Sequence, residues 1–203
     1  MTPSSGQNAQ ADRPHTGRRR NERVREAILA AAMDLLAHSD GTPVTVDTIA
    51  RAAGVGKQTI YRWWPSKGAV FLDALSERAA TVAPEVDTGA LAGDLEAFVT
   101  ATFTGAAAPE TAPVLRSLAR EAAHDRHLAG MMSEFTAARR AALRDILERA
   151  GRRGELAGDA DLDLMVDQVY GVLWYRLILD HAPLTADVAV RLARTLVAAS
   201  AAR

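Results

Sequence analysis

Three side chains with long hydrogen-bonding groups lie close together in the segment GKQTIYRWW, namely Lys57, Gln58 and Arg62. Lys and Arg can donate to guanine and Gln can pair with adenine in the major groove of DNA, which is wide enough to admit one helix. If the segment is helical, these three side chains face outward, because Ile60 and Trp64 occupy its apolar face. We therefore predict that Lys57, Gln58 and Arg62 contact base edges.

A second group of side chains surrounds these three and is suited to phosphate oxygens, which position a protein on DNA without reading its sequence. The group consists of Thr45, Thr59, Tyr61, Trp63 and Lys67. These residues lie at or near expected helix starts, where free backbone N–H groups also attract an anion. The alternative is a small helical hairpin whose polar face is only solvated.

Two short helices joined by a tight turn must position these groups. Apolar residues recur at helical spacing from Val46 to Ala53, and Thr45 can cap that helix. Gly54 can adopt the left-handed conformation that closes a helix. The second helix is expected from Lys57 to about Trp64, with Ile60 inside.

The run TIARAAGVGKQTIYRWWPSK resembles the helix-turn-helix signature of the TetR family of bacterial transcriptional regulators, and the resemblance extends over about residues 23–75. The matching positions are Ile49-Ala50, Ala53-Gly54-Val55, Lys57, Tyr61 and Pro65-Ser66-Lys67. Gly56 stands where the family commonly has Ser, Gln58 where Gly is common, and Gly68 where Glu often follows Lys. Because a side chain at position 58 can add a base contact, the operator sequence cannot be borrowed from a relative.

The basic residues are concentrated in the N-terminal third of the chain. Residues 1–67 contain ten Lys or Arg against six Asp or Glu, a net charge of +4, whereas residues 68–203 contain fourteen against nineteen, a net charge of −5. We expect a flexible basic arm over residues 1–20, in which Arg18, Arg19 and Arg20 reach phosphates or a minor groove. The alternative is a solubilising charge run.

The remaining pattern is helical throughout, which predicts an all-α protein. A helix-turn-helix DNA-binding domain is expected over residues 21–67, beginning with a helix over 21–37, and a helical ligand-binding and dimerisation domain over 68–203. The helix after Pro65 runs towards Val82, and residues 84–93 form a connection. Further helices are expected over about 91–107, 113–124, 128–150, 162–180 and 185–201.

The expected helix over 162–180 has apolar residues around much of its circumference, which is typical of a helix covered on two sides. We expect a second subunit to supply one cover, and the resemblance agrees because TetR-like proteins dimerise through their last two helices. The predicted interface residues are Leu173, Leu177, Leu192 and Leu196. The alternative is a monomer with a crowded core.

A cavity for a small, largely apolar effector is implied by the resemblance. The residues expected to line it are Phe98, Phe103, Leu115, Leu118, Met131, Met132, Phe135, Tyr170 and Trp174. Arg120, His124 or Arg176 could supply polar contacts. The alternative for each apolar residue is an ordinary place in the core.

Catalytic and membrane functions find little support in the sequence. Cysteine is absent, which excludes disulfides and thiolate chemistry. No apolar run is long enough to span a membrane, no signal peptide is evident, and a cytoplasmic location is expected. His124 and His127 have a spacing that can hold a metal, but no third ligand is evident. We therefore expect no metal, cofactor or enzymatic activity.

These observations predict a ligand-responsive transcriptional regulator, most simply a repressor, that binds an inverted-repeat operator in double-stranded DNA as a homodimer. Two other classes stay open. One is a helical small-molecule binding or carrier protein without useful DNA affinity. The other is a metal-dependent enzyme that uses His124 and His127.

Overall fold

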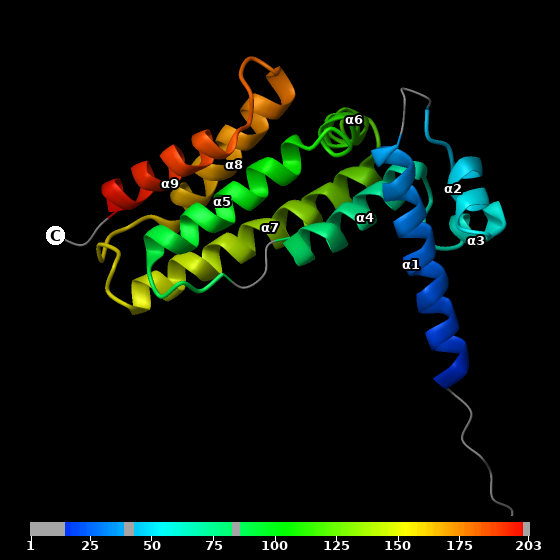
Figure 1. The fold of residues 1–203 in the computed structure, drawn as a ribbon, viewed down its shortest axis with the longest axis horizontal. Coiled ribbons are helices and arrows are strands. Elements are labelled where there is room, and N and C mark those ends of the chain that lie inside the picture. The colour runs from blue at the N-terminus through cyan, green and yellow to red at the C-terminus, as the bar shows by residue number, and fades with distance from the viewer. Residues whose placement is uncertain (1–14, 39–42, 83–85, 201–203) are drawn as a thin grey trace, which may run out of the picture.

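The computed structural model describes residues 15–38, 43–82 and 86–200, and their regular structure is made of nine α-helices (Figure 1). In chain order they are α1 (His15–Ala37), α2 (Val46–Ala52), α3 (Lys57–Tyr61), α4 (Lys67–Val82), α5 (Leu91–Ala107), α6 (Ala112–Ala122), α7 (Arg126–Arg152), α8 (Leu162–Leu179) and α9 (Ala186–Ser200). The all-helical fold predicted from the sequence is confirmed.

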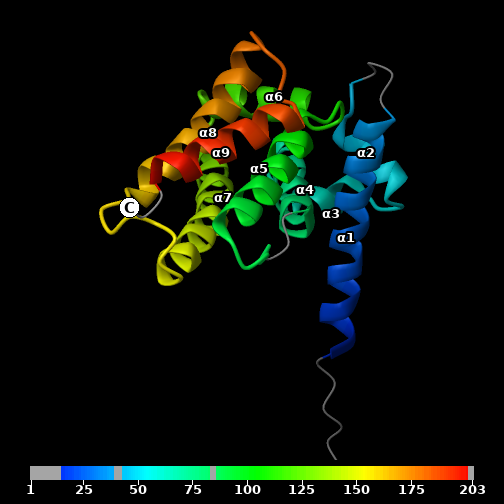
Figure 2. The same cartoon turned by 60° about the vertical axis from the view of Figure 1, so that its left-hand side comes forward.

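The first three helices form a small unit at one end of the molecule (Figures 1 and 2). Its core contains the fully buried side chains of Ile28, Ile49 and Ile60, one from each helix. Thr45 caps α2 as predicted, because its hydroxyl accepts a hydrogen bond from the N–H of Thr48 at 3.2 Å. Gly54 has φ +66°, the left-handed conformation that glycine adopts without strain and that turns the chain from α2 into α3.

Helix α4 joins this unit to the rest of the chain. The Ser66 hydroxyl caps it by accepting a hydrogen bond from the N–H of Ala69 at 3.2 Å. α4 contacts α1 and also α7, and Val70 and Leu72 are buried within the common core. The domain boundary proposed from the sequence, between residues 67 and 68, therefore falls at the start of a helix that packs on both units.

The larger unit is built around α5, which contacts α4, α6, α7, α8 and α9. α7 is the longest helix and lies beside α4 and α5, while α8 and α9 lie at the end of the molecule opposite α2 and α3 (Figures 1 and 2). The most extensive contact between the first three helices and the rest of the chain is that of α1 with α4, so a change among the helices of the larger unit can reach them through α4.

The helix boundaries expected from the sequence hold to within a few residues, except at the start of the chain. α1 begins at His15 and not at Asn21, since a run of Arg residues favours helix. Residues 1–14 of the expected flexible arm lie outside the described residues. In the part of the chain that the structure describes, no helix has the length and apolar character needed to cross a membrane.

Candidate DNA-binding surface and effector cavity

The outer face of α3 presents most of the side chains that the sequence assigns to DNA. Lys57, Gln58, Tyr61 and Arg62 are exposed, whereas Ile60 is fully buried beneath them. The helical hydrogen bonding continues past Tyr61, because the N–H of Arg62 bonds to the carbonyl of Gln58 at 3.1 Å. The exposed donors therefore lie together on the outer face of α3 and the turn that follows it.

The remaining predicted phosphate contacts differ in how accessible they are. Thr59 and Trp63 are half-buried, and Trp63 packs on the core beside the Trp64 ring, with 5.5 Å between the ring centroids. Thr45 and Lys67 are exposed at the starts of α2 and α4. The Lys67 ammonium lies 6.0 Å from the centroid of the Phe71 ring.

Lys57 is held by a carboxylate on the neighbouring helix. Its Nζ lies 2.6 Å from Oδ1 of Asp47 in α2, and both side chains are about half exposed. The hydrogen bond that Lys57 donates to Asp47 raises the pKa of Lys57 above its ordinary value. Because the pair is open to solvent, phosphates or base edges of DNA can compete with Asp47 for the ammonium group.

The arginine run expected in a flexible arm lies instead in a helix. Arg18, Arg19 and Arg20 belong to the first turns of α1, so the expectation of an unstructured arm is wrong at these three positions. Their side chains lie outside the described residues.

The end of the α3 segment is tied to α4 and α1 through one carboxylate. The indole Nε1 of Trp64 donates to Oδ2 of Asp73 at 2.9 Å, and Nη2 of Arg25 donates to Oδ1 of Asp73 at 2.7 Å. Arg25 also pairs with Glu77. Because Trp64 is buried, the predicted reading helix cannot shift independently of α4.

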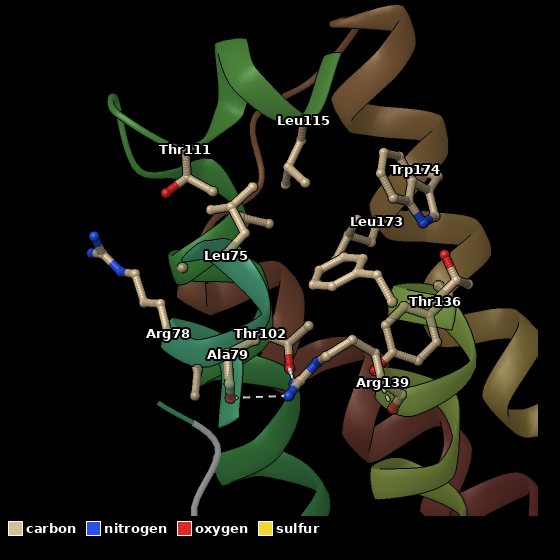
Figure 3. A pocket seen from close by; sticks show the side chains of 15 residues that line it. Leu75, Arg78, Ala79, Thr102, Thr111, Leu115, Thr136, Arg139, Leu173 and Trp174 are labelled. Carbon is tan, nitrogen blue, oxygen red and sulfur yellow. Dashed lines mark hydrogen bonds between the residues drawn. The ribbon is translucent and has the colours of Figure 1, made fainter. Parts of the chain in front are cut away.

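A cavity of about 90 Å³ lies in the larger unit, between α4, α5, α6, α7 and α8 (Figure 3). It is lined by Leu75, Arg78, Ala79, Ala101, Thr102, Gly105, Ala106, Thr111, Leu115, Phe135, Thr136, Arg139, Tyr170, Leu173 and Trp174. Typical ligand sites measure roughly 300–1,000 Å³. A drug-sized ligand would therefore have to move the surrounding helices apart.

Only part of the cavity lining was predicted from the sequence. Leu115, Phe135, Tyr170 and Trp174 line it as predicted. The five other residues expected there do not line it: Phe98, Phe103 and Leu118 are fully buried in the core, and Met131 and Met132 pack half-buried against that core. Phe98 and Phe103 lie on α5, whose apolar residues face several neighbouring helices. Because α9 covers much of α5, these side chains lie in the core and not at the cavity.

The polar groups of the cavity differ from the expected ones. Arg120 and His124 are exposed elsewhere, and Arg176 donates to the carbonyl of Pro183 at 2.7 Å. The cavity is instead lined by Arg139, which has no distinguishing signal in the sequence because it stands in an ordinary surface pattern, AARRAAL. The Tyr170 hydroxyl donates to the carbonyl of Arg139 at 2.8 Å, and burial raises the pKa of Tyr170 to about 12.

The predicted dimer residues on α8 and α9 lie mostly inside the chain. Leu173, Leu177 and Leu196 are only 2–4% exposed, and Leu173 also lines the cavity, so their own chain already covers these three side chains. Leu192 is half-buried. The outward face of α8 carries other apolar side chains, which are 44–59% exposed: Leu164, Tyr175, Ile178 and Leu179.

The histidines considered as metal ligands are both on the surface. His124 and His127 are exposed around the start of α7. No group of three or more His, Cys, Asp or Glu side chains that could hold a metal ion comes together within residues 15–38, 43–82 and 86–200.

Comparisons with known proteins cover both units. A family model described as bacterial regulatory proteins, tetR family, matches residues 28–74, and one described as tetracyclin repressor-like, C-terminal domain, matches residues 85–196. The uncharacterized HTH-type transcriptional regulator YdeS of Bacillus subtilis is 35% identical over 164 residues, which is 80% of this chain and 82% of the relative. The DNA-binding transcriptional repressor TetR of Mycobacteroides abscessus is 33% identical over 171 residues, 79% of this chain and 85% of the relative.

A solved structure shows the same arrangement of helices. The TetR family transcription regulator SCO0332 superimposes with a TM-score of 0.76 at 32% sequence identity, covering 86% of this chain and 97% of that chain.

Proposed function

Because the chain belongs to the TetR family of bacterial transcriptional regulators, we propose that it is a repressor that binds an inverted-repeat operator as a homodimer and is released by a small, largely apolar effector. It would act on DNA in the cytoplasm, without a cofactor and without catalysing a reaction. The observation that carries the DNA-binding role is the outer face of α3, where Gln58, Tyr61 and Arg62 are exposed. Ile60, on the opposite side of the same helix, is buried in the core.

The roles of the side chains follow from their positions. Lys57, Gln58 and Arg62 would read base edges, and Tyr61 and Lys67 would contact phosphates from the end of α3 and the start of α4. Arg18, Arg19 and Arg20, in the first turns of α1, would add phosphate contacts. Thr45 would place the N-terminus of α2 near a phosphate.

The dimer would form through the outward face of α8, which replaces the residues predicted from the sequence. Leu164, Tyr175 and Ile178 lie on one stripe, since they are separated by eleven and three residues, and all three are about half exposed or more. Gly171 lies on the same stripe, and a Cβ built there would have no other atom within 4 Å. A second copy of α8 could therefore approach closely and cover these apolar side chains.

The effector would act through α4, which lines the cavity with residues of its second half and packs against α6 and α7 at its start. Leu75, Arg78 and Ala79 of α4 line the cavity. At the start of α4, Gly68 lies against Leu118 and Leu128, at the corner between α6 and α7. Expansion of the small cavity would displace α4, and with it the start of the helix where Lys67 lies.

The size of the response is limited by linkage. An effector can change DNA affinity only by its differential affinity for the two forms of the dimer, typically about 1–3 kcal/mol, and DNA must weaken effector binding by the same factor. A ligand that binds equally well with and without DNA would be bound but would not regulate.

The salt dependence of duplex binding tests the DNA-binding role. The logarithm of the association constant should fall linearly with the logarithm of salt concentration, and Lys67→Ala should flatten the slope by about 0.9. Arg194→Ala, on α9 at the opposite end of the molecule, is a matched loss of charge that should leave the slope unchanged. Absence of duplex binding at low salt, with apolar ligands still bound, would favour the carrier function instead.

A further inference from the structure

Arg139 is the cationic group of the cavity, and it spans three helices. It extends from α7, where its Nη1 donates to the carbonyl of Ala79 in α4 at 3.1 Å and its Nη2 donates to the Thr102 hydroxyl in α5 at 3.2 Å (Figure 3). Its guanidinium carbon lies 5.2 Å from the centroid of the Phe98 ring. The group is half-buried, so it is partly shielded from water at the cavity wall.

The hydrogen-bond partners that the structure describes for the Arg139 guanidinium, Ala79 and Thr102, are neutral. Among the described residues, no carboxylate lies within ion-pair distance of its guanidinium, whereas the adjacent Arg140 pairs with Asp167 and Arg78, the other arginine at the cavity, pairs with Glu110 at 2.9 Å. The remaining lining residues are apolar or carry hydroxyl groups. Within residues 15–38, 43–82 and 86–200, the cavity therefore holds one positive charge that no carboxylate pairs with.

We propose that the effector is an apolar molecule that carries a single carboxylate, and that this carboxylate binds Arg139. A planar guanidinium can bind a carboxylate through two parallel hydrogen bonds, which a neutral alcohol cannot match. The apolar walls formed by Leu75, Leu115 and Trp174 would take the rest of the molecule. The proposal rests on the effector role proposed above and specifies its chemistry.

The same contact gives the effector a direct effect on α4. Ala79 lies in the last turn of α4, where carbonyl groups lack partners within the helix, and the Arg139 cation there also interacts favourably with the helix dipole. A carboxylate that engages Nη1 and Nη2 competes with Ala79 and Thr102 for the same donors. Withdrawal of Arg139 would free the end of α4, the helix that holds Trp64 through Asp73.

The proposal is tested by comparing how tightly the full-length protein binds an acid and the alcohol of the same shape. The probes are hexanoate with hexan-1-ol, octanoate with octan-1-ol, and 4-phenylbutanoate with 4-phenylbutan-1-ol, measured at neutral pH by calorimetry. At least one acid should bind about tenfold or more tightly than its alcohol. That acid should also release the duplex selected by the protein from a random pool.

Substitutions at Arg139 show whether this side chain causes the preference for the acid over the alcohol. Arg139→Met should abolish the advantage of the acid and leave the affinity for the alcohol within a few-fold, while Arg139→Lys, which keeps the charge, should retain part of it. Arg140→Met removes the same charge from the adjacent residue outside the cavity and should keep the full advantage. If Arg139→Met does not fold, Arg139→Gln and Arg139→Lys give the same comparison.

The results separate this proposal from the broader one. If no acid binds better than its alcohol, or if the advantage survives Arg139→Met and Arg139→Gln, the carboxylate proposal is overturned. Release of DNA by the alcohols in that case would leave the effector role intact. If the acids bind through Arg139 but DNA is not released, the chemistry of the site stands and the regulatory role fails.

Discussion

Gly68 lies so close to Leu118 that a Cβ added to it would be 3.3 Å from the Leu118 Cδ2 atom. The same Cβ would be 3.4 Å from Glu121 Oε2 and from Leu128 Cδ2. The corner between α6 and α7 therefore rests on the first turn of α4, next to Lys67. A side chain at position 68 would therefore press against this corner.

Gly68→Glu should destabilise the protein, because a larger charged side chain must enter a buried position next to the carboxylate of Glu121. The free energy of unfolding in urea should fall by about 1–3 kcal/mol, and duplex binding should weaken as the start of α4 moves. Gly130→Glu is the matched control, since Gly130 is an exposed helical glycine with nothing within 4 Å of an added Cβ. Equal unfolding free energies for wild type and Gly68→Glu would show that the contact is loose.

Asp47→Asn should strengthen DNA binding. The substitution removes the carboxylate that holds Lys57 at 2.6 Å and also removes a negative charge near the phosphates. We expect a several-fold gain in affinity at low salt that diminishes as salt screens the charges. Asp34→Asn, an exposed aspartate near the end of α1, should give a smaller gain. Weaker DNA binding by Asp47→Asn would indicate that Asp47 holds Lys57 in the position from which it contacts a DNA base.

Charged substitutions on the outward face of α8 should dissociate the proposed dimer. Tyr175→Glu with Ile178→Glu places two charges on exposed side chains, so the chain should remain folded while its mass in solution falls to that of one chain. Ala137→Glu with Ala138→Glu, on an exposed part of α7, should leave the dimer intact. An unchanged dimer mass for the Tyr175 and Ile178 variant would place the interface elsewhere.

Asp94 should make stability sensitive to acid. Burial alone would raise the pKa of its carboxyl group, but hydrogen bonds from the N–H and hydroxyl of Thr88, at 2.6 and 2.8 Å, and from Arg153, at 3.1 Å, outweigh burial and lower the pKa below its ordinary value. Because the folded-state pKa lies below the unfolded one, this stabilisation is complete above about pH 4 and is lost as the pH falls through the folded value.

The test is a comparison of wild type with Asp94→Asn. At pH 7 the variant should unfold with a free energy about 1–3 kcal/mol lower, and the difference should shrink below pH 4 because the wild-type carboxylate is then being protonated. A difference that is constant from pH 7 to pH 3 would contradict the lowered pKa.

The helices could be predicted from the sequence because their signals are local. Caps at Thr45 and Ser66, the turn at Gly54 and the apolar spacing within each helix are properties of neighbouring residues. The exposed face of α3 followed in the same way, since burial of Ile60 fixes which side chains turn outward.

The cavity and the dimer surface depend on which helix faces meet, and that information is not local. Arg139 and Arg140 are adjacent and identical, yet only Arg139 lines the cavity. On α8, the strongly apolar Leu173 and Leu177 fill the core, whereas the exposed stripe includes Tyr175 and Gly171. Hydrophobicity alone therefore does not tell which side chains of α8 its own chain covers.

Selection of bound duplexes from a random pool tests the central claim most directly. A two-fold dimer with two reading helices predicts an inverted repeat whose half-site centres lie about 34–36 Å apart, one helical turn, or a multiple of it. Gln58→Ala and Arg62→Ala should each relax preference at one base pair per half-site, by about 1–3 kcal/mol of discrimination. Enriched sequences without two-fold symmetry, or the same operator selected by both variants and wild type, would contradict the account.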